Sequence, residues 1–420
     1  MLEGWCTTCL LALVLVGQSR PSEPPHAAVV WAVDALEVVA AFDQPLDPKT
    51  PGSLVGQAIS YDDLQGQAKS SPRKLRIAAA RLEDDGHTLI LVTDPHPRNT
   101  LYHPPIPGAG SYSLSGVQAD WGEPDDLPEN PRWSLWLPTL DLDEALRDVK
   151  RSRRHASLRE RLARPGRLTL ATLVTLPVGQ ATLHLETTGS IEDALLGDTQ
   201  ADPITDGKTP RHALDLAAES RGEPLYLSIT IKTGATKTPF DLHASLSQKG
   251  APTQAISANQ LLLPWAPARG TTSSPPATTP TLEGGDADRG RTLFFGDQAK
   301  CSQCHAHGGK GGAVGPDLTR PRVLDRAWIY QSIATPSAQI EPEFTTYTVA
   351  LKDGQVHSGV VRALDAASIQ VVDSNAHPAV IKRDQIVRLQ PSATSIMPVG
   401  LAAALGDPAI RDLIAFLMAR

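Results

Sequence analysis

Cysteine is scarce in this chain: its 420 residues include only Cys6, Cys9, Cys301 and Cys304. Small secreted folds that depend on disulfides carry many more cysteines, so the sequence excludes a disulfide scaffold. Basic residues are also in the minority, with 39 Lys and Arg against 46 Asp and Glu and a formal net charge of −7. Because binding to phosphate backbones usually needs a basic surface, we expect no nucleic-acid partner.

Aromatic residues are few as well, at 5%, whereas 36 prolines and 32 glycines interrupt the chain. This composition favours strands separated by turns over long helices. The length is too great for one ordinary hydrophobic core, so we expect two to four domains. The sequence contains no evident loop for a hydride cofactor or a phosphate, no nucleophile elbow and no catalytic triad, which favours a role other than catalysis.

The N-terminus contains an apolar run from Cys9 to Gly17, which is too short to cross a bilayer. It predicts a signal peptide over residues 1–19, although Glu3 stands where a positive charge is usual. We therefore expect an exported protein of the periplasm or cell envelope, with a retained membrane anchor as the alternative. Cys6 and Cys9 have the spacing of a thioredoxin site, but a targeting segment provides no fold around them.

Apolar and β-branched stretches separated by turn residues continue to about residue 250. The segments AFDQPLDP, DDGHTLILV and YSLSGVQADWG resemble bacterial immunoglobulin-like surface modules, and the resemblance implies β-sandwiches that associate with the cell envelope. A run of mixed charges between two β-rich parts predicts a solvated connecting helix. We expect a first sandwich over residues 27–125, a connecting helical segment over 126–165, a second sandwich over 166–250 and a linker rich in Pro, Thr and Ser over 251–286.

The strongest chemical signal is the segment CSQCH, which contains Cys301, Cys304 and His305. Its spacing allows two thiols to add to the two vinyl groups of a haem while the adjacent imidazole binds the iron. Zinc bound by these three residues and His307 is the competing interpretation, but a closed zinc site needs a second ligand pair farther along the chain. We therefore expect one covalently bound haem c whose iron is coordinated by His305.

A second axial ligand completes a six-coordinate iron. Met397 lies beside Pro398 in a predicted turn, just before an apolar C-terminal helix, and we predict that it is the distal ligand. Met418 lies within that apolar helix, where packing in the core is the default interpretation. The histidines that remain as alternatives are His307, His357 and His377.

Residues 287–420 resemble a class I cytochrome c, and more narrowly the planctomycete-type haem-binding domain family. The matching stretches are CSQCHAHGGKGGAVGPDLT, IYQSIATPSAQIEPEFTTYTV and SIMPVGLAAALGDPAIRDLIAFL. The resemblance implies an all-α class I cytochrome c fold in which the carbonyl of Pro316 accepts a hydrogen bond from His305. It also implies an aromatic contact between the first and last helices, from Phe294 or Phe295 to Phe416.

Residues 345–390 depart from the simplest cytochrome c, because their alternating pattern predicts five short strands with a hairpin turn at 352–355. We expect a small SH3-like or Sm-like β-barrel, which would be either a lid over one haem edge or a docking surface for a redox partner. The expected fold class is therefore multidomain, with N-terminal all-β sandwiches and an all-α C-terminal domain that carries this insert.

Ligation by histidine and methionine raises the reduction potential of a haem and leaves no open position on the iron. We therefore expect electron transfer to or from a redox partner, such as a dehydrogenase or another cytochrome. A haem enzyme of the peroxidase kind is one alternative, and it would need an open distal position. A cell-surface binding protein with an accessory haem domain is another, because β modules make up most of the chain.

Overall fold

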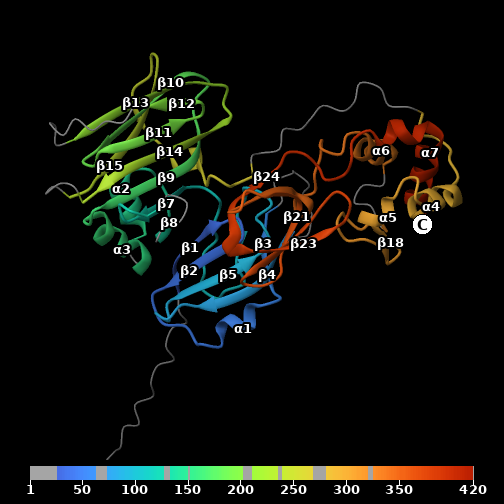
Figure 1. Cartoon of the computed structure of the whole chain (residues 1–420), viewed down its shortest axis with the longest axis horizontal. Coiled ribbons are helices and arrows are strands. Elements are labelled where there is room, and N and C mark those ends of the chain that lie inside the picture. The colour runs from blue at the N-terminus through green and yellow to red at the C-terminus, as the bar shows by residue number, and fades with distance from the viewer. Residues whose placement is uncertain are drawn as a thin grey trace, which may run out of the picture.

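The structure is a computed structural model with two β-rich bodies at one side and a group of helices at the other, namely α4 (Ala287–Phe295), α5 (Cys301–Cys304), α6 (Arg326–Ala334) and α7 (Leu401–Met418) (Figure 1). A further small sheet from the C-terminal third lies between them. The predicted signal peptide, Cys6 and Cys9, and residues 268–280 of the predicted linker lie outside the described residues. None of the helices described is long and apolar enough to cross a membrane. The described residues are 26–62, 73–126, 133–149, 152–201, 211–234, 239–267, 281–319 and 325–419.

The first β-rich body consists of β1 (Ala27–Asp34), β2 (Glu37–Phe42), α1 (Thr50–Leu54), β3 (Ala58–Tyr61), β4 (Arg73–Leu82), β5 (Thr88–Thr93) and β6 (Tyr102–His103). Its strands form a sheet in the order β1-β2-β5-β4-β3-β6. Val38 and Ala40 of β2 belong to one buried cluster, and Val39 and Ala41 belong to another. Since successive side chains of a strand point to opposite faces, both faces of this sheet are covered.

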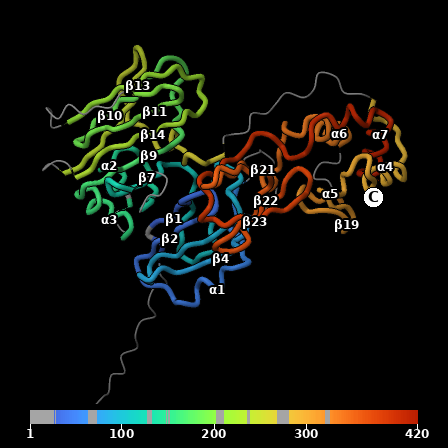
Figure 2. The backbone as a smooth tube through the Cα atoms, in the orientation of Figure 1, coloured from blue at the N-terminus to red at the C-terminus, as the bar shows by residue number. Residues whose placement is uncertain are grey.

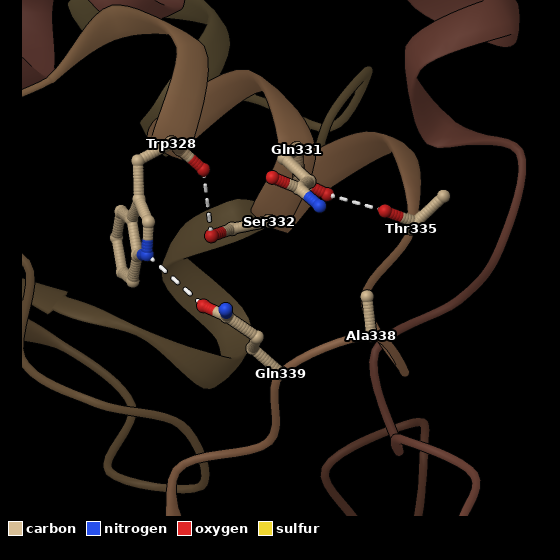
Figure 3. A pocket seen from close by; sticks show the side chains of 6 residues that line it. All are labelled: Trp328, Gln331, Ser332, Thr335, Ala338 and Gln339. Carbon is tan, nitrogen blue, oxygen red and sulfur yellow. Dashed lines mark hydrogen bonds between the residues drawn. The ribbon is translucent and has the colours of Figure 1, made fainter. Parts of the chain in front are cut away.

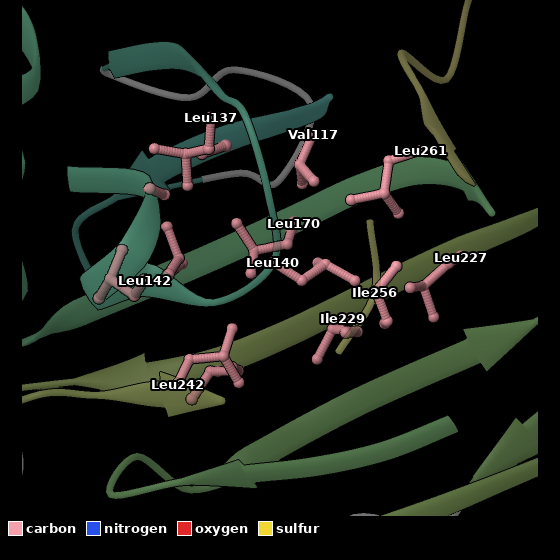
Figure 4. Close-up of a cluster of buried hydrophobic side chains, with 14 of the residues drawn as sticks. Val117, Leu137, Leu140, Leu142, Leu170, Leu227, Ile229, Leu242, Ile256 and Leu261 are labelled. Carbon is pink, nitrogen blue, oxygen red and sulfur yellow. The ribbon is translucent and has the colours of Figure 1, made fainter. Parts of the chain in front are cut away.

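The second β-rich body consists of β7 (Val117–Gly122), β8 (Trp133–Leu137), α2 (Leu142–Asp148), α3 (Arg153–Leu162), β9 (Gly166–Thr175), β10 (Gly179–Thr187), β11 (Ile191–Leu196), β12 (Thr199–Ala201), β13 (His212–Ser220), β14 (Pro224–Thr233), β15 (Leu242–Gln248), β16 (Gln254–Ala255), the 3₁₀ turn η1 (Ala258–Gln260) and β17 (Leu261–Leu262). One sheet has the order β12-β11-β14-β9-β7-β8, with β17 beside β9, and the other has the order β13-β10-β15-β16. Leu170 and Ile229 of the first sheet share a core with Leu242 of the second (Figure 4). This body is therefore a two-sheet sandwich.

The boundary expected between the two sandwiches runs through this second body. β7 lies in the range expected for the first sandwich, yet Ala119 of β7 pairs with Leu170 of β9. The segment predicted to be a solvated connecting helix instead forms α2 and α3, whose Leu146 and Leu158 are buried in the sandwich core. Trp31 of β1 belongs to the same core, so the two β-rich bodies pack directly on each other.

The C-terminal third contains α4 (Ala287–Phe295), α5 (Cys301–Cys304), β18 (Ala306–His307), β19 (Lys310–Gly311), α6 (Arg326–Ala334), η2 (Pro342–Phe344), β20 (Thr346–Leu351), β21 (Val356–Ala363), β22 (Ser368–Val372), β23 (Pro378–Lys382), η3 (Arg383–Gln385), β24 (Ile386–Pro391) and α7 (Leu401–Met418). The prediction of an all-α C-terminal domain with the class I cytochrome c fold is therefore wrong. A five-stranded sheet occupies this part of the chain, and among its described helices only α7 reaches 18 residues. Even α7 is kinked, because Gly406 has non-helical backbone angles.

The five-stranded sheet docks on the first β-rich body (Figure 2). The Tyr347 hydroxyl donates to the His96 carbonyl at 3.1 Å. The guanidinium of Arg73 lies 2.7 Å from a carboxylate oxygen of Glu343 and 2.8 Å from one of Glu341. The strand order β23-β22-β21-β20-β24 leaves β23 and β24 at opposite ends, so the described strands form an open sheet and not a closed barrel.

Candidate functional site

The CSQCH segment forms the single helical turn α5 and the residue after it. The His305 amide donates to the Cys301 carbonyl at 2.9 Å, which closes the turn. Residues three apart on a helical turn lie on the same side, so Cys301 and Cys304 lie on one face of α5. Lys300, just before the turn, has a left-handed backbone with φ of 53°, which is costly for a residue with a side chain and is often found at functional sites.

The ring of His305 is held by the backbone of the loop that follows. Its Nδ1 donates to the carbonyl of Pro316 at 2.9 Å, which is the hydrogen bond that the family resemblance implied. Because a carbonyl only accepts, Nδ1 carries the hydrogen, and Nε2 keeps the lone pair that a metal ion needs. Burial lowers the pKa of His305, so the imidazole is neutral at neutral pH.

Glycines allow the loop to lie this close to α5 and His305. A Cβ on Gly315 would lie 2.5 Å from Cε1 of His305, and one on Gly312 would lie 2.0 Å from the Gln303 carbonyl oxygen. The Gly312 and Gly315 amides donate to the carbonyls of Ser302 and Cys304, each at 2.8 Å. Gly312 and Gly315 are therefore explained by the backbone packing that holds the imidazole in place.

Both thiols are free and protonated. Burial raises the pKa of Cys301 to about 11, and burial together with the carboxylate of Asp373 raises the pKa of Cys304. A redox dithiol or a reactive nucleophile would need a lowered pKa instead. The two cysteines are therefore poor candidates for thiol catalysis.

Metal binding was predicted at His305 and Met397, and the described side chains do not form a metal site by themselves, which contradicts this prediction for a metal without a porphyrin. No group of three or more His, Cys, Asp or Glu side chains among them could hold a metal ion. This finding also excludes the zinc interpretation with Cys301, Cys304, His305 and His307. A porphyrin supplies four ligands itself and takes only axial ligands from the protein, so covalent haem attachment does not depend on such a group.

His307 does not face away from the helices but packs at their crossing. Its ring centroid lies 4.4 Å from that of Phe416 and 5.8 Å from that of Phe294. The aromatic contact expected between the first and last helices is also present, with 5.5 Å between the rings of Phe294 and Phe416. His307 therefore has a packing role, which removes one alternative to Met397.

Met397 lies half-buried on the loop before α7, and its amide donates to the Ser395 hydroxyl at 3.1 Å. The Ser395 amide in turn donates to the Ser337 hydroxyl, which ties this loop to the segment after α6. None of the contacts described joins Met397 to His305, so its role as distal ligand stays a prediction. His357 lies on β21, and His377 lies exposed in the turn after β22, beside Asp373.

Apolar side chains around α5 are only partly covered. Phe294, Leu413 and Phe416 belong to a buried cluster between α4, α6 and α7. Further apolar side chains pack on this cluster and stay partly exposed, and Cys301 is one of them. Cys301 therefore lies at the edge of the apolar core that α4, α6 and α7 share. The partly exposed set is Leu282, Leu293, Cys301, Leu318, Trp328, Tyr330, Ile333, Ala402, Leu405 and Met418.

A small hollow on α6 offers no second candidate site. Trp328, Ser332 and Gln339 are among the residues that line it (Figure 3). The indole of Trp328 donates to the Gln339 side chain at 3.2 Å, and the Ser332 hydroxyl donates to the Trp328 carbonyl at 2.9 Å. These polar groups already satisfy one another, so the hollow presents little for a ligand to bind.

No family model matches the chain, and no curated protein matches its sequence significantly. Similar solved structures include an anti-sigma factor domain-containing protein from Clostridium clariflavum, which is 8% identical. The match covers 56% of this chain and 90% of that protein, with a TM-score of 0.26. The PA14 sugar-binding domain from RTX adhesin has 8% identity, covers 36% of this chain and 99% of its own, and has a TM-score of 0.26. A β-glucosidase from Kluyveromyces marxianus in complex with glucose is 14% identical, and the match covers 32% of this chain and 17% of the β-glucosidase, with a TM-score of 0.23. TM-scores this low support no conclusion about fold, ligand or activity.

Proposed function

We propose that this protein binds one haem c covalently through Cys301 and Cys304 and transfers electrons. The observation that carries the proposal is the fixed imidazole of His305. Its Nδ1 donates to the Pro316 carbonyl, its ring lies against the backbone at Gly315, and its Nε2 keeps a lone pair. Cys301 and Cys304 lie on the helical turn just before it. Hydrogen bonding at the far nitrogen orients an imidazole ligand and strengthens it as a donor.

Each residue of the CSQCH segment and its surroundings has a distinct role in this proposal. Cys301 and Cys304 would hold the haem by thioether bonds, and His305 would be the proximal ligand with Met397 as the distal one. When bound, the haem would supply one-electron exchange at its iron. The partly exposed apolar side chains around α5 would exclude water from it, which lowers the local dielectric and helps to set the reduction potential. In this role the protein is an electron carrier and not an enzyme.

We further propose that the chain is exported and that its partner is a redox protein of the periplasm or cell envelope, such as a dehydrogenase or another cytochrome. The N-terminal apolar run has the length expected for the middle of a signal peptide, which supports export. The β-rich bodies would then present the haem-bearing segment at the cell envelope.

Covalent attachment is tested by producing the full chain together with a haem-attachment system. We expect haem to stay with the protein after acid–acetone extraction and to give an alkaline pyridine haemochrome spectrum. The variant with both Cys301→Ser and Cys304→Ser should lose it. His305→Ala should abolish the low-spin spectrum, whereas His307→Ala is the matched control because His307 packs on Phe416. Native protein without retained haem would overturn the proposal.

The distal ligand is tested separately with Met397→Ala. Loss of the thioether should open a position on the iron, change the ferric spectrum and lower the reduction potential. An unchanged spectrum would reject Met397 while leaving attachment at Cys301 and Cys304 intact. Peroxide turnover by the unaltered protein would instead favour the alternative of a peroxidase-like haem enzyme.

A further inference from the structure

The solvent-facing side of the sheet β13-β10-β15 brings a histidine, an aspartate and a serine together (the three strands are labelled in Figure 1). His184 lies on the central strand β10, with Asp215 directly opposite it on β13. On β15, Ser245 lies directly opposite His184, and Ser247 is two residues farther along the same face. Three extended strands therefore fix the positions of these side chains.

The hydrogen bonds of this group run in one direction. Nδ1 of His184 lies 2.7 Å from Oδ1 of Asp215, and Nε2 lies 2.7 Å from Oγ of Ser247. A carboxylate only accepts, so Nδ1 carries the hydrogen and the neutral ring accepts at Nε2 from the Ser247 hydroxyl. This is the arrangement in which an imidazole acts as general base toward a serine, with the carboxylate holding the tautomer.

We propose that Ser247 is a nucleophile that accepts the acyl group of an ester, with His184 as its base and Asp215 orienting the ring. Oγ of Ser247 would bond to the ester carbonyl carbon while its proton moves to Nε2. The bond from that carbon to the leaving alcohol oxygen then breaks, and the alcohol takes the proton from Nε2. The product is an O-acyl serine and a free alcohol.

The exposure of His184 and Asp215 to solvent determines how fast this acyl transfer is expected to be. The side chains of His184 and Asp215 are 30% and 68% exposed, so the site is open to large acyl donors, and water screens the charge of Asp215. What the geometry supplies is general-base assistance, which contributes roughly 10²- to 10⁴-fold in enzymes. We therefore expect a measurable covalent modification of Ser247 with slow turnover. The site lies on a different body from CSQCH and does not depend on haem.

The test is labelling of the full chain with an alkyl fluorophosphonate, read by peptide mass spectrometry, and release of p-nitrophenol from p-nitrophenyl acetate. We expect label at Ser247, a rate about 100-fold lower in His184→Gln, and a smaller drop in Asp215→Asn. Ser245→Ala is the matched control, because Ser245 lies on the same face of β15, and its rate should match that of the unaltered chain.

Three results would overturn the proposal: no label on folded protein, equal labelling of Ser245 and Ser247, or a rate that His184→Gln leaves unchanged. Circular dichroism of each variant shows whether the sandwich has folded. If a variant is unfolded, the labelled position in the unaltered protein decides, since only Ser247 donates a hydrogen bond to His184 and should be labelled in preference to Ser245.

Discussion

Replacement of Gly290 by alanine probes the crossing of α4 and α7, which supports the CSQCH segment. A Cβ at this position would lie 2.0 Å from the carbonyl oxygen of Asp412 and 2.8 Å from Cβ of Phe416. Carbon and oxygen approach to about 3.3 Å, so the helices would have to separate by about 1 Å. Overpacking of this kind costs about 1–3 kcal/mol, and the oxygen is backbone and cannot rotate away.

The intrinsic preference of helices acts in the opposite direction. Alanine is better than glycine in a helix by about 1 kcal/mol, so the two effects compete. Because separation of the helices also weakens the contact between Phe294 and Phe416, we expect the steric cost to dominate. With the steric cost at the upper end of its range, about 3 kcal/mol, the net loss should be about 2 kcal/mol, which corresponds to about thirtyfold faster local opening.

Hydrogen exchange of peptides from α4 and α7 is the suitable assay, because a chain with several bodies has no single free energy of unfolding. Gly52→Ala is the matched control: Gly52 lies in α1, where an added Cβ meets nothing within 4 Å. Exchange in α1 should stay the same or become slower. If Gly290→Ala leaves exchange in α4 and α7 unchanged, the close approach of these helices is refuted.

Two further predictions concern ionic contacts. The Arg289 guanidinium holds the pKa of Asp412 below its usual range. The contact therefore stabilises the helices at neutral pH and is lost as the pH falls through that lowered pKa. Asp412→Asn should remove this acid-dependent step, measured by hydrogen exchange of α4. Arg73→Ala should loosen the docking of the five-stranded sheet by about 1–3 kcal/mol, because it leaves Glu341 and Glu343 without their shared cation. Faster exchange in β20 and β4 would support this second prediction, and unchanged exchange would contradict it.

Strands could be predicted from the sequence wherever the pattern was local. The five strands expected between residues 345 and 390 lie at β20 to β24, because alternating residues and turns determine them without help from distant segments. The prediction of an all-α C-terminal domain was wrong, and it came from the family resemblance and not from the periodicity of the residues. The described helices there are short, and Gly406 interrupts the longest of them.

At the candidate site, the sequence identified the residue types but not all of their neighbours. The CSQCH spacing pointed to Cys301, Cys304 and His305, and the hydrogen bond from His305 to Pro316 followed from the resemblance. The effect of Asp373 on the pKa of Cys304 could not be foreseen, because the two residues are far apart in the sequence and only the folded chain brings them together. The group around His184 was missed for a similar reason: its three members lie on separate strands, and only the register of the sheet aligns them.

Because the five-stranded sheet docks on the first β-rich body, the β-rich bodies cannot simply be cut from the C-terminal part and studied alone. A fragment that ends near residue 250 would test binding by the β-rich bodies only if they folded without the C-terminal part. Such a fragment would lack β17, which pairs with β9, and would expose the surface of Arg73 that Glu341 and Glu343 cover. Binding or aggregation by it could then come from that exposed surface. Substitutions in the full chain, which keep β17 and the docked sheet in place, are therefore the sounder way to assign a role to each body.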